Sequence, residues 1–99
     1  MHVILYKFQV KDEEHEQFIT AWKQLTIYFR EYSYSLGSRL HKQNENTYLA
    51  YAQWPDKPTS EKANAFLPKE ASKVSLQMRN ACKQIKVIDR LEVVADLLV

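Results

Sequence analysis

The apolar residues of this chain repeat with two different periods, and the order in which those periods alternate limits the fold more than any other feature. Residues 3–10 alternate between two faces, with Ile4 and Phe8 on the same face, which is the two-residue period of a β-strand. From Phe18 to Tyr32 the bulky residues recur at steps of four and three, which predicts a helix with one aromatic stripe. The chain therefore begins with a strand followed by a helix.

Capping and breaking residues divide the remainder of the chain. Asp12 is expected to cap the first helix, and Gly37, the only glycine, opens a second extended stretch. Pro55 ends a later strand, after which Thr59 or Ser60 is expected to cap a short helix. The later elements are expected at residues 37–42 (strand), 47–54 (strand), 59–66 (short helix), 68–85 (helix) and 86–99 (strand).

The resulting order is strand, helix, strand, strand, helix, strand. Two right-handed crossovers in this order place both main helices on one face of a four-stranded antiparallel sheet. We therefore predict an α+β fold of the ferredoxin-like βαββαβ type. Ninety-nine residues leave room for one hydrophobic core, so residues 1–99 are expected to form a single domain.

Several predicted strands are apolar on both faces, so the face without helices also needs a cover. Leu5 lies on the opposite face of its strand from Ile4, and Leu49 and Tyr51 alternate with alanines. The last strand, an edge in this topology, ends in the apolar residues 97–99, and a bare apolar edge is prone to aggregate. We expect a homodimer in which two sheets face each other as a dimeric α/β barrel.

Composition argues against several classes of function. Fourteen Lys and Arg residues against twelve Asp and Glu, scattered along the chain, do not form the basic stripe of a nucleic-acid binder. No segment approaches the roughly 20 apolar residues of a membrane span. The single cysteine, Cys82, and the dispersed His2, His15 and His41 form no metal-ligand pattern, and a reducing cytoplasm is the expected location.

Two segments resemble the antibiotic biosynthesis monooxygenase-like family of the dimeric α/β-barrel superfamily. They are residues 36–41, Leu-Gly-Ser-Arg-Leu-His, and residues 48–54, Tyr-Leu-Ala-Tyr-Ala-Gln-Trp, because family members commonly end this strand in Trp. The resemblance extends over essentially the whole chain and implies the same fold. The family includes proteins that oxidise polycyclic phenols without metal or flavin, proteins that degrade haem, and proteins with no assigned substrate.

Trp54 shares a strand face with Ala50 and Ala52, and two small side chains beside a large aromatic one are typical of a cavity wall that stacks a flat molecule. The alternative is that the alanines simply allow the first helix, with Trp22 and Phe29, to pack closely. The residues expected around a cavity are Phe8, Trp22, Phe29, Ala50, Ala52, Phe66 and Met78.

The phenol-oxidising resemblance implies a cofactor-independent monooxygenase acting on a small phenol- or quinol-type substrate. Polar donors in an apolar cavity would be enough for that chemistry, because a deprotonated substrate can itself pass an electron to dioxygen. The candidate catalytic donors are Trp54, Asn64, Arg39 and Tyr6. We expect neither a metal nor a cofactor.

Three other functions are alternatives to this one. A non-catalytic dimer of the same fold could bind a small molecule or regulate a partner. Haem-degrading relatives carry a ligating His on the helix after the Trp, and residues 61–66 contain no His, which makes haem binding less favoured. An RNA-recognition domain shares the element order, but residues 47–54 lack its basic-Gly-aromatic signature.

Overall fold

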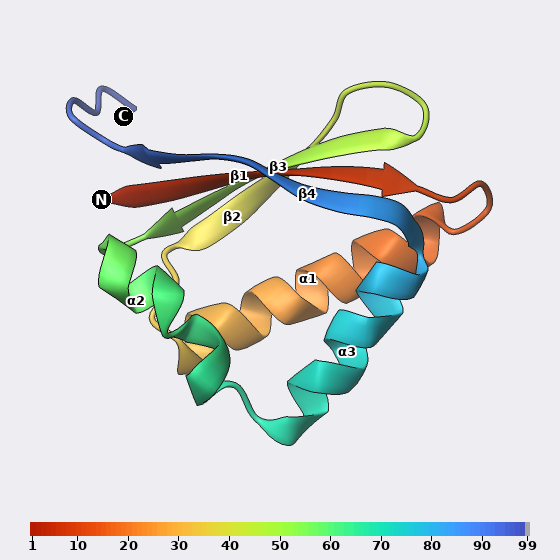
Figure 1. The fold of residues 1–99 in the computed structure, drawn as a ribbon, viewed down its shortest axis with the longest axis horizontal. Coiled ribbons are helices and arrows are strands. Elements are labelled where there is room, and N and C mark those ends of the chain that lie inside the picture. Colours follow the sequence, from red (N-terminus) through yellow and green to blue (C-terminus); the bar gives the residue numbers. More distant parts are fainter. Residues whose placement is uncertain (99) are drawn as a thin grey trace.

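A computed structural model describes residues 1–98, which fold as a sheet with two long helices on one face (Figure 1). The elements are β1 (His2–Val10), α1 (His15–Tyr32), β2 (Gly37–Lys42), β3 (Thr47–Trp54), α2 (Lys57–Glu61), the 3₁₀ helix η1 (Ala63–Phe66), α3 (Lys69–Asn80) and β4 (Cys82–Glu92). The strands lie in the order β2-β3-β1-β4 and every neighbouring pair is antiparallel. The predicted ferredoxin-like α+β fold is confirmed.

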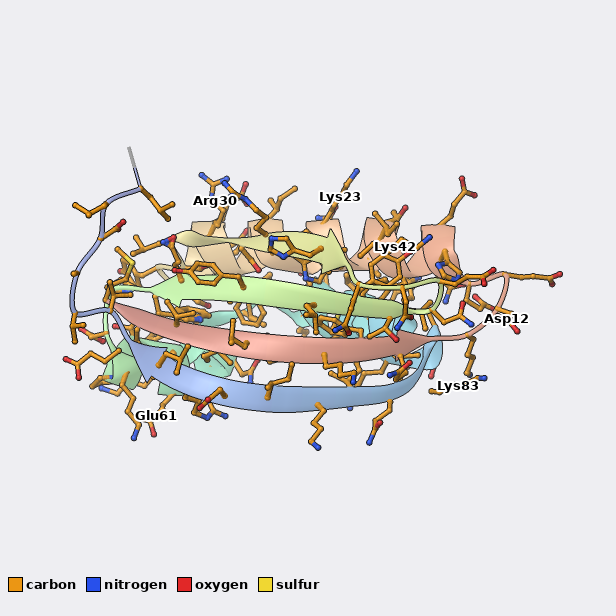
Figure 2. All side chains as sticks on the ribbon, turned by 90° about the horizontal axis from the view of Figure 1, so that it is seen from above. Asp12, Lys23, Arg30, Lys42, Glu61 and Lys83 are labelled. Carbon is orange, nitrogen blue, oxygen red and sulfur yellow. The ribbon has the colours of Figure 1, made fainter. Side chains whose placement is uncertain are left out.

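Strand β1 lies in the centre of the sheet and sets which residues face the helices. It pairs with β3 so that Ile4 lies opposite Ala52 and Phe8 lies opposite Tyr48. Because directly paired residues share a face of the sheet, these side chains all point toward α1 and α3. The odd-numbered residues of β1, including Leu5, point to the face without helices, which Figure 2 views directly.

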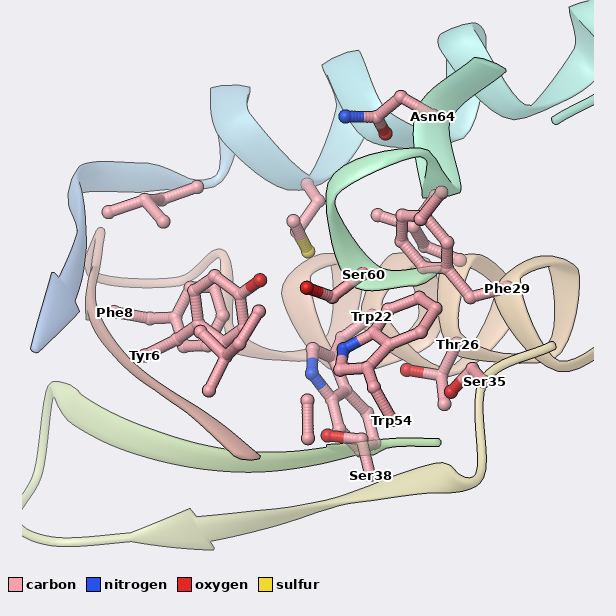
Figure 3. A pocket seen from close by; sticks show the side chains of 16 residues that line it. Tyr6, Phe8, Trp22, Thr26, Phe29, Ser35, Ser38, Trp54, Ser60 and Asn64 are labelled. Atoms are coloured by element: carbon pink, nitrogen blue, oxygen red, sulfur yellow. The ribbon is translucent and has the colours of Figure 1, made fainter. Parts of the chain in front are cut away.

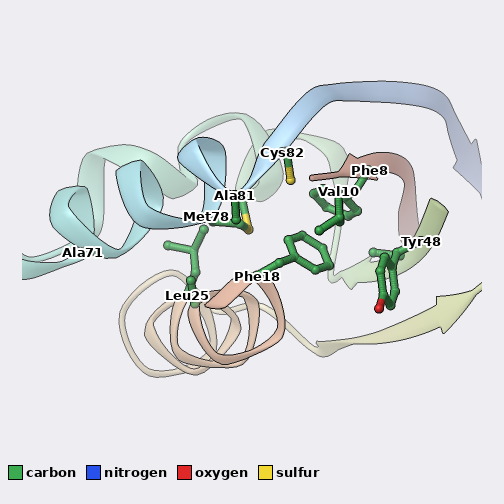
Figure 4. Close-up of a cluster of buried hydrophobic side chains, with 11 residues drawn as sticks. Phe8, Val10, Phe18, Leu25, Tyr48, Ala71, Met78, Ala81 and Cys82 are labelled. Carbon is green, nitrogen blue, oxygen red and sulfur yellow. The ribbon is translucent and has the colours of Figure 1, made fainter. Parts of the chain in front are cut away.

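The larger core cluster lies at the end of the sheet where α1 begins and α3 ends (Figure 4). Phe18 of α1 is completely buried, with its ring centroid 4.9 Å from that of Phe8 and 5.1 Å from that of Tyr48. Met78 and Cys82 close the cluster from α3 and the start of β4. This part of the interior is filled by side chains.

A polar network joins the start of α1 to the β2–β3 turn. His15 Nδ1 lies 2.7 Å from the Tyr48 hydroxyl, and His15 Nε2 lies 3.0 Å from Asn46 Oδ1. The Asn46 amide donates to Asp12 Oδ1 at 3.0 Å. The expectation that Asp12 caps the helix is therefore wrong, since α1 begins after Glu14 and has no side-chain cap.

The N-cap of the short helix α2 lies three residues before Thr59, the first residue expected to cap it. Asp56 Oδ1 accepts a hydrogen bond from the Thr59 backbone N–H at 2.8 Å, so Asp56 is the N-cap in place of Thr59 or Ser60. Pro58 lies in the first turn, where its missing N–H costs nothing. Hydrogen bonding from Thr59, first from its side chain and then from its backbone N–H, lowers the pKa of the Asp56 carboxyl.

The last strand differs from its expected range at both ends. β4 starts at Cys82, which brings Ile85 into the sheet although it was assigned to the helix, and β4 ends at Glu92. The Val93 N–H still donates to the Met1 carbonyl at 2.9 Å, and residues 94–98 lie outside the sheet. Val99 lies outside the described residues.

Candidate functional site

A cavity of about 240 Å³ lies between the sheet and the helices, beside the filled core, with which it shares Phe8, Leu25 and Met78. Every helix and strand contributes to it, and Ser35 comes from the connection between α1 and β2 (Figure 3). The residues around it are Ile4, Tyr6, Phe8, Trp22, Leu25, Thr26, Phe29, Ser35, Ser38, Ala52, Trp54, Ser60, Ala63, Asn64, Met78 and Ile85. None of these side chains carries a carboxylate, an ammonium, a guanidinium or an imidazole, so the wall is aromatic and neutral.

Trp54 is the last residue of β3 and closes one side of the cavity. Only 5% of its surface is exposed, and its ring meets that of Phe29 edge-on, with 5.7 Å between centroids. Its indole Nε1 is buried and has no hydrogen-bond partner among residues 1–98. Because buried N–H groups in proteins nearly always have a partner, this donor is available to a molecule bound in the cavity.

Tyr6 brings a phenol to the same cavity from the centre of β1. Burial raises the pKa of the Tyr6 hydroxyl above its usual value, and the positive charge of Arg90 opposes part of that effect. At neutral pH the hydroxyl is therefore protonated and able to donate a hydrogen bond. Tyr6 suits the role of a donor to a substrate oxygen better than the role of a strong base.

Hydroxyl groups complete the polar part of the wall. The Ser60 hydroxyl donates to the Lys57 carbonyl at 2.7 Å, and the Ser35 hydroxyl oxygen accepts from the Gly37 N–H at 3.0 Å. Thr26 and Ser38 add two more hydroxyls from α1 and β2. The cavity therefore offers several neutral hydrogen-bonding groups around an aromatic interior.

Comparison with known proteins finds this fold among solved structures, whereas no family model and no curated protein matches the sequence. A variant of SnoaB, a cofactor-independent oxygenase from Streptomyces nogalater, matches with a TM-score of 0.78 and 16% identity over 99% of this chain and 97% of that chain. An antibiotic biosynthesis monooxygenase matches with a TM-score of 0.75 and 14% identity over 96% and 100%. An uncharacterized NIPSNAP domain protein from Burkholderia xenovorans matches with a TM-score of 0.71 and 9% identity over 96% of both chains.

The chain has the fold of the antibiotic biosynthesis monooxygenases. At such low identities the likeness concerns the fold, which carries more than one function. The function of this chain depends on the chemistry of its own cavity.

Sequence reasoning placed many of the right residues around the cavity of this monooxygenase fold. Those that line it are Tyr6, Phe8, Trp22, Phe29, Ala52, Trp54, Asn64 and Met78. Asn64 lies at the rim on η1 with an exposed side chain, apart from the two indoles (Figure 3). The alternative, in which the alanines only allow close helix packing, applies to Ala50 and not to Ala52.

Three expected residues lie elsewhere. Arg39 pairs with Tyr51 and so points to the helix-free face of the sheet, where it is exposed. Ala50 is buried beneath the large core cluster, and Phe66 on η1 is 52% exposed outside the cavity. We therefore remove Arg39, Ala50 and Phe66 from the candidate site.

The hydroxyls of Thr26, Ser35, Ser38 and Ser60 were missed by sequence reasoning. Strand register contained a signal for one of them, since Ser38 pairs with Ala52 and shares its face. The others come from a helix, a loop and a short helix, and only the fold brings them together.

The residues present do not fit a histidine-ligated haem. No histidine lines the cavity, and both ring nitrogens of His15 are engaged by Tyr48 and Asn46 at the other end of the molecule. Across residues 1–98, no three His, Cys, Asp or Glu side chains gather as a metal site. Within the same residues, no helix combines the length and apolar character needed to cross a membrane.

Proposed function

We propose that this protein is a cofactor-independent monooxygenase that oxidises a small phenol- or quinol-type substrate in the cavity beside Trp54. The observation that carries the proposal is the buried, unpartnered indole N–H of Trp54 in a neutral aromatic cavity. The fold shared with a cofactor-independent oxygenase supports it. The single cysteine suits a cytoplasmic protein, which is the location we propose.

The proposed reaction requires the protein only to stabilise the substrate anion. In the keto tautomer of a phenol one ring carbon is a CH₂ group; when this group loses a proton, the resulting carbanion passes an electron to dioxygen, and the two radicals combine into a peroxide. Loss of water then leaves a carbonyl, so one oxygen atom of O₂ enters the product and the other leaves as water. Donors that face the substrate oxygen lower the energy of the anion, which is the slow point of such a sequence.

We propose that three side chains supply this stabilisation. The Trp54 indole and the Tyr6 hydroxyl donate from the cavity wall, and Asn64 offers an amide at the rim. Because the wall contains no carboxylate and no imidazole, we propose that the substrate's own acidity, raised by these donors, drives the loss of its proton.

Oxygen uptake with one- and two-ring phenol- and quinol-type compounds tests the proposal, with ¹⁸O₂ and mass spectrometry to show one labelled atom in the product. We expect Trp54→Phe to lower kcat by about 100-fold, the usual effect of removing one donor to a developing oxyanion. Tyr32→Phe, an exposed aromatic of α1 outside the cavity, is the control and should leave kcat unchanged. Uptake that is equal in the wild type and in Trp54→Phe would contradict the proposal.

The absence of a basic side chain from the cavity wall also favours a second candidate function. A binding or regulatory protein with this fold would hold the same molecules without turning them over. Tight binding of substrate analogues together with no oxygen uptake across the whole panel would support that function instead.

We also propose that the protein is a homodimer joined through the helix-free face of the sheet. Leu91 is 42% exposed on that face, where it pairs with Val3, and Leu97 and Leu98 extend beyond β4 at 100% and 71% exposure. Burying such a surface against a second copy removes an apolar edge from water.

Sedimentation of the wild type at about 10 µM, a concentration at which nanomolar to low-micromolar dimers persist, tests the assembly. Leu91→Lys should shift the protein to monomer, whereas Leu76→Lys, at a leucine of α3 that is 51% exposed, should not. A monomeric wild type, or the same behaviour in both variants, would rule out this interface.

A further inference from the structure

Two indole groups, from different elements, turn their nitrogen atoms toward the same part of the cavity. Trp22 comes from α1 and Trp54 from the end of β3, and both line the cavity. In Figure 3 their nitrogens and the Ser60 hydroxyl all face the central space that Tyr6 also enters. The chain contains no other tryptophan.

The chemistry of these groups restricts what can lie between them. An indole N–H donates a hydrogen bond and cannot accept one, so the ligand atom facing the two tryptophans must be an acceptor. The Ser60 hydroxyl proton is already donated to the Lys57 carbonyl at 2.7 Å, so Ser60 presents lone pairs to the cavity. A hydroxyl on the ligand satisfies both demands, because its oxygen accepts and its proton is donated.

Charge and size restrict the ligand further. With no cationic side chain in the wall, a carboxylate or phosphate would enter without a counter-charge, which is costly in an apolar cavity. A volume of about 240 Å³ lies below the roughly 300–1,000 Å³ of pockets for drug-sized molecules. A ligand with one or two aromatic rings suits this space.

We propose that Trp22, Trp54 and Ser60 form a recognition site for the hydroxyl group of an uncharged one- or two-ring arene. Trp22 and Trp54 donate to the hydroxyl oxygen, and Ser60 accepts its proton. The inference rests on the proposed function only in taking this cavity as the substrate site. Trp22 and Ser60 thereby become residues that determine specificity.

Calorimetric titration with four two-ring compounds tests the site without turnover. We expect 2-naphthol to bind about fivefold more tightly than 2-methoxynaphthalene, which accepts but cannot donate, because one hydrogen bond is lost. The hydrocarbon 2-methylnaphthalene should bind more weakly again, and 2-naphthoate should bind at least tenfold more weakly than 2-naphthol because it is an uncompensated anion.

Variants assign the effect to named groups. Ser60→Ala should abolish the preference for 2-naphthol over 2-methoxynaphthalene. Ser72→Ala is the matched control, since the Ser72 hydroxyl donates to the Lys69 carbonyl at the same 2.7 Å but at an exposed position of α3 outside the cavity. Trp22→Phe should weaken 2-naphthol about fivefold and change 2-methylnaphthalene by less than twofold.

The two indole N–H signals in a ¹H–¹⁵N spectrum give a second readout, assigned with the Trp22→Phe and Trp54→Phe variants. Both signals should move downfield as 2-naphthol is added. Equal affinity for 2-naphthol and 2-naphthoate in the wild type, or an indole signal from Trp22 that does not respond, would overturn the inference. Selective binding without oxygen uptake would refute the proposed function but support this inference. Oxygen uptake without selective binding would support the proposed function but refute this inference.

Discussion

Removal of one buried hydroxyl should loosen the wall of the cavity. Ser33, at the end of α1, is completely buried, and its hydroxyl donates to the Ala63 carbonyl at 2.6 Å. This hydrogen bond ties η1, which carries Asn64, to the main helix across thirty residues of sequence. Ser33→Ala leaves the Ala63 carbonyl buried without that donor, which costs about 1–3 kcal/mol of unfolding free energy.

Urea denaturation measures the loss directly, and hydrogen exchange of residues 57–67 shows where it occurs. The control is again Ser72→Ala, which removes a hydroxyl bound to a carbonyl three residues away on an exposed helix. Water replaces that bond, so its loss should stay within about 0.5 kcal/mol. If both serine variants lose the same stability, or if exchange in residues 57–67 is unchanged in Ser33→Ala, then Ser33 does not hold the wall.

Three further outcomes follow from the contacts and pKa shifts. Burial raises the pKa of the Cys82 thiol to about 11, so at pH 8 alkylation of the native protein, followed by mass spectrometry, should be at least 100-fold slower than in urea. Because burial raises the pKa of Tyr6, the folded state holds the hydroxyl proton more tightly than the unfolded state does. The free energy of unfolding should therefore fall as the pH rises above about 10. Thermal melts should show a less steep fall in Tyr6→Phe. His15→Ala should cost about 1–2 kcal/mol, and combining it with Asn46→Ala in a double-mutant cycle should give less than the sum, because the two side chains share a hydrogen bond.

Strands β1, β2 and β3 were predictable almost to the residue because their information is local. Each signal acts on neighbouring backbone positions: the alternation over residues 3–10, the glycine at the start of β2 and the proline after Trp54. Gly37 has φ of 106°, a conformation that L side chains rarely adopt, which explains the glycine at that turn.

The end of the chain was misread because an apolar run looks like a strand whether or not a partner exists. The pairing of β1 with β4 runs only from His2–Glu92 to Val10–Cys82, so the apolar residues after Glu92 have no strand partner and Val94 is 92% exposed. A pattern in one segment cannot report the length of the segment beside it. Pairing is a property of two strands together.

The error over Arg39 has a different cause, because the face of each residue in β2 depends on the register of β2 with β3. Antiparallel pairing with β3 sets the face of every residue in β2, and Ser38 shares the face of Ala52 whereas Arg39 shares that of Tyr51. A one-residue change in register exchanges the two faces. Without the turn geometry at residues 43–46, the choice between Ser38 and Arg39 could not be made from the strand alone.

The molecule divides into an end that supplies stability and an end that binds. The large core cluster around Phe18 and Tyr48 is filled, whereas the small cluster of Ile4, Trp54 and Ala63 borders the cavity and leaves the Trp54 N–H without a partner. An unsatisfied buried donor opposes folding, so it persists only where the filled end supplies a stability margin. Substitutions within the cavity wall should therefore change ligand affinity more than stability. Ser33 lies outside the cavity and holds η1 in place, so its substitution should mainly reduce stability.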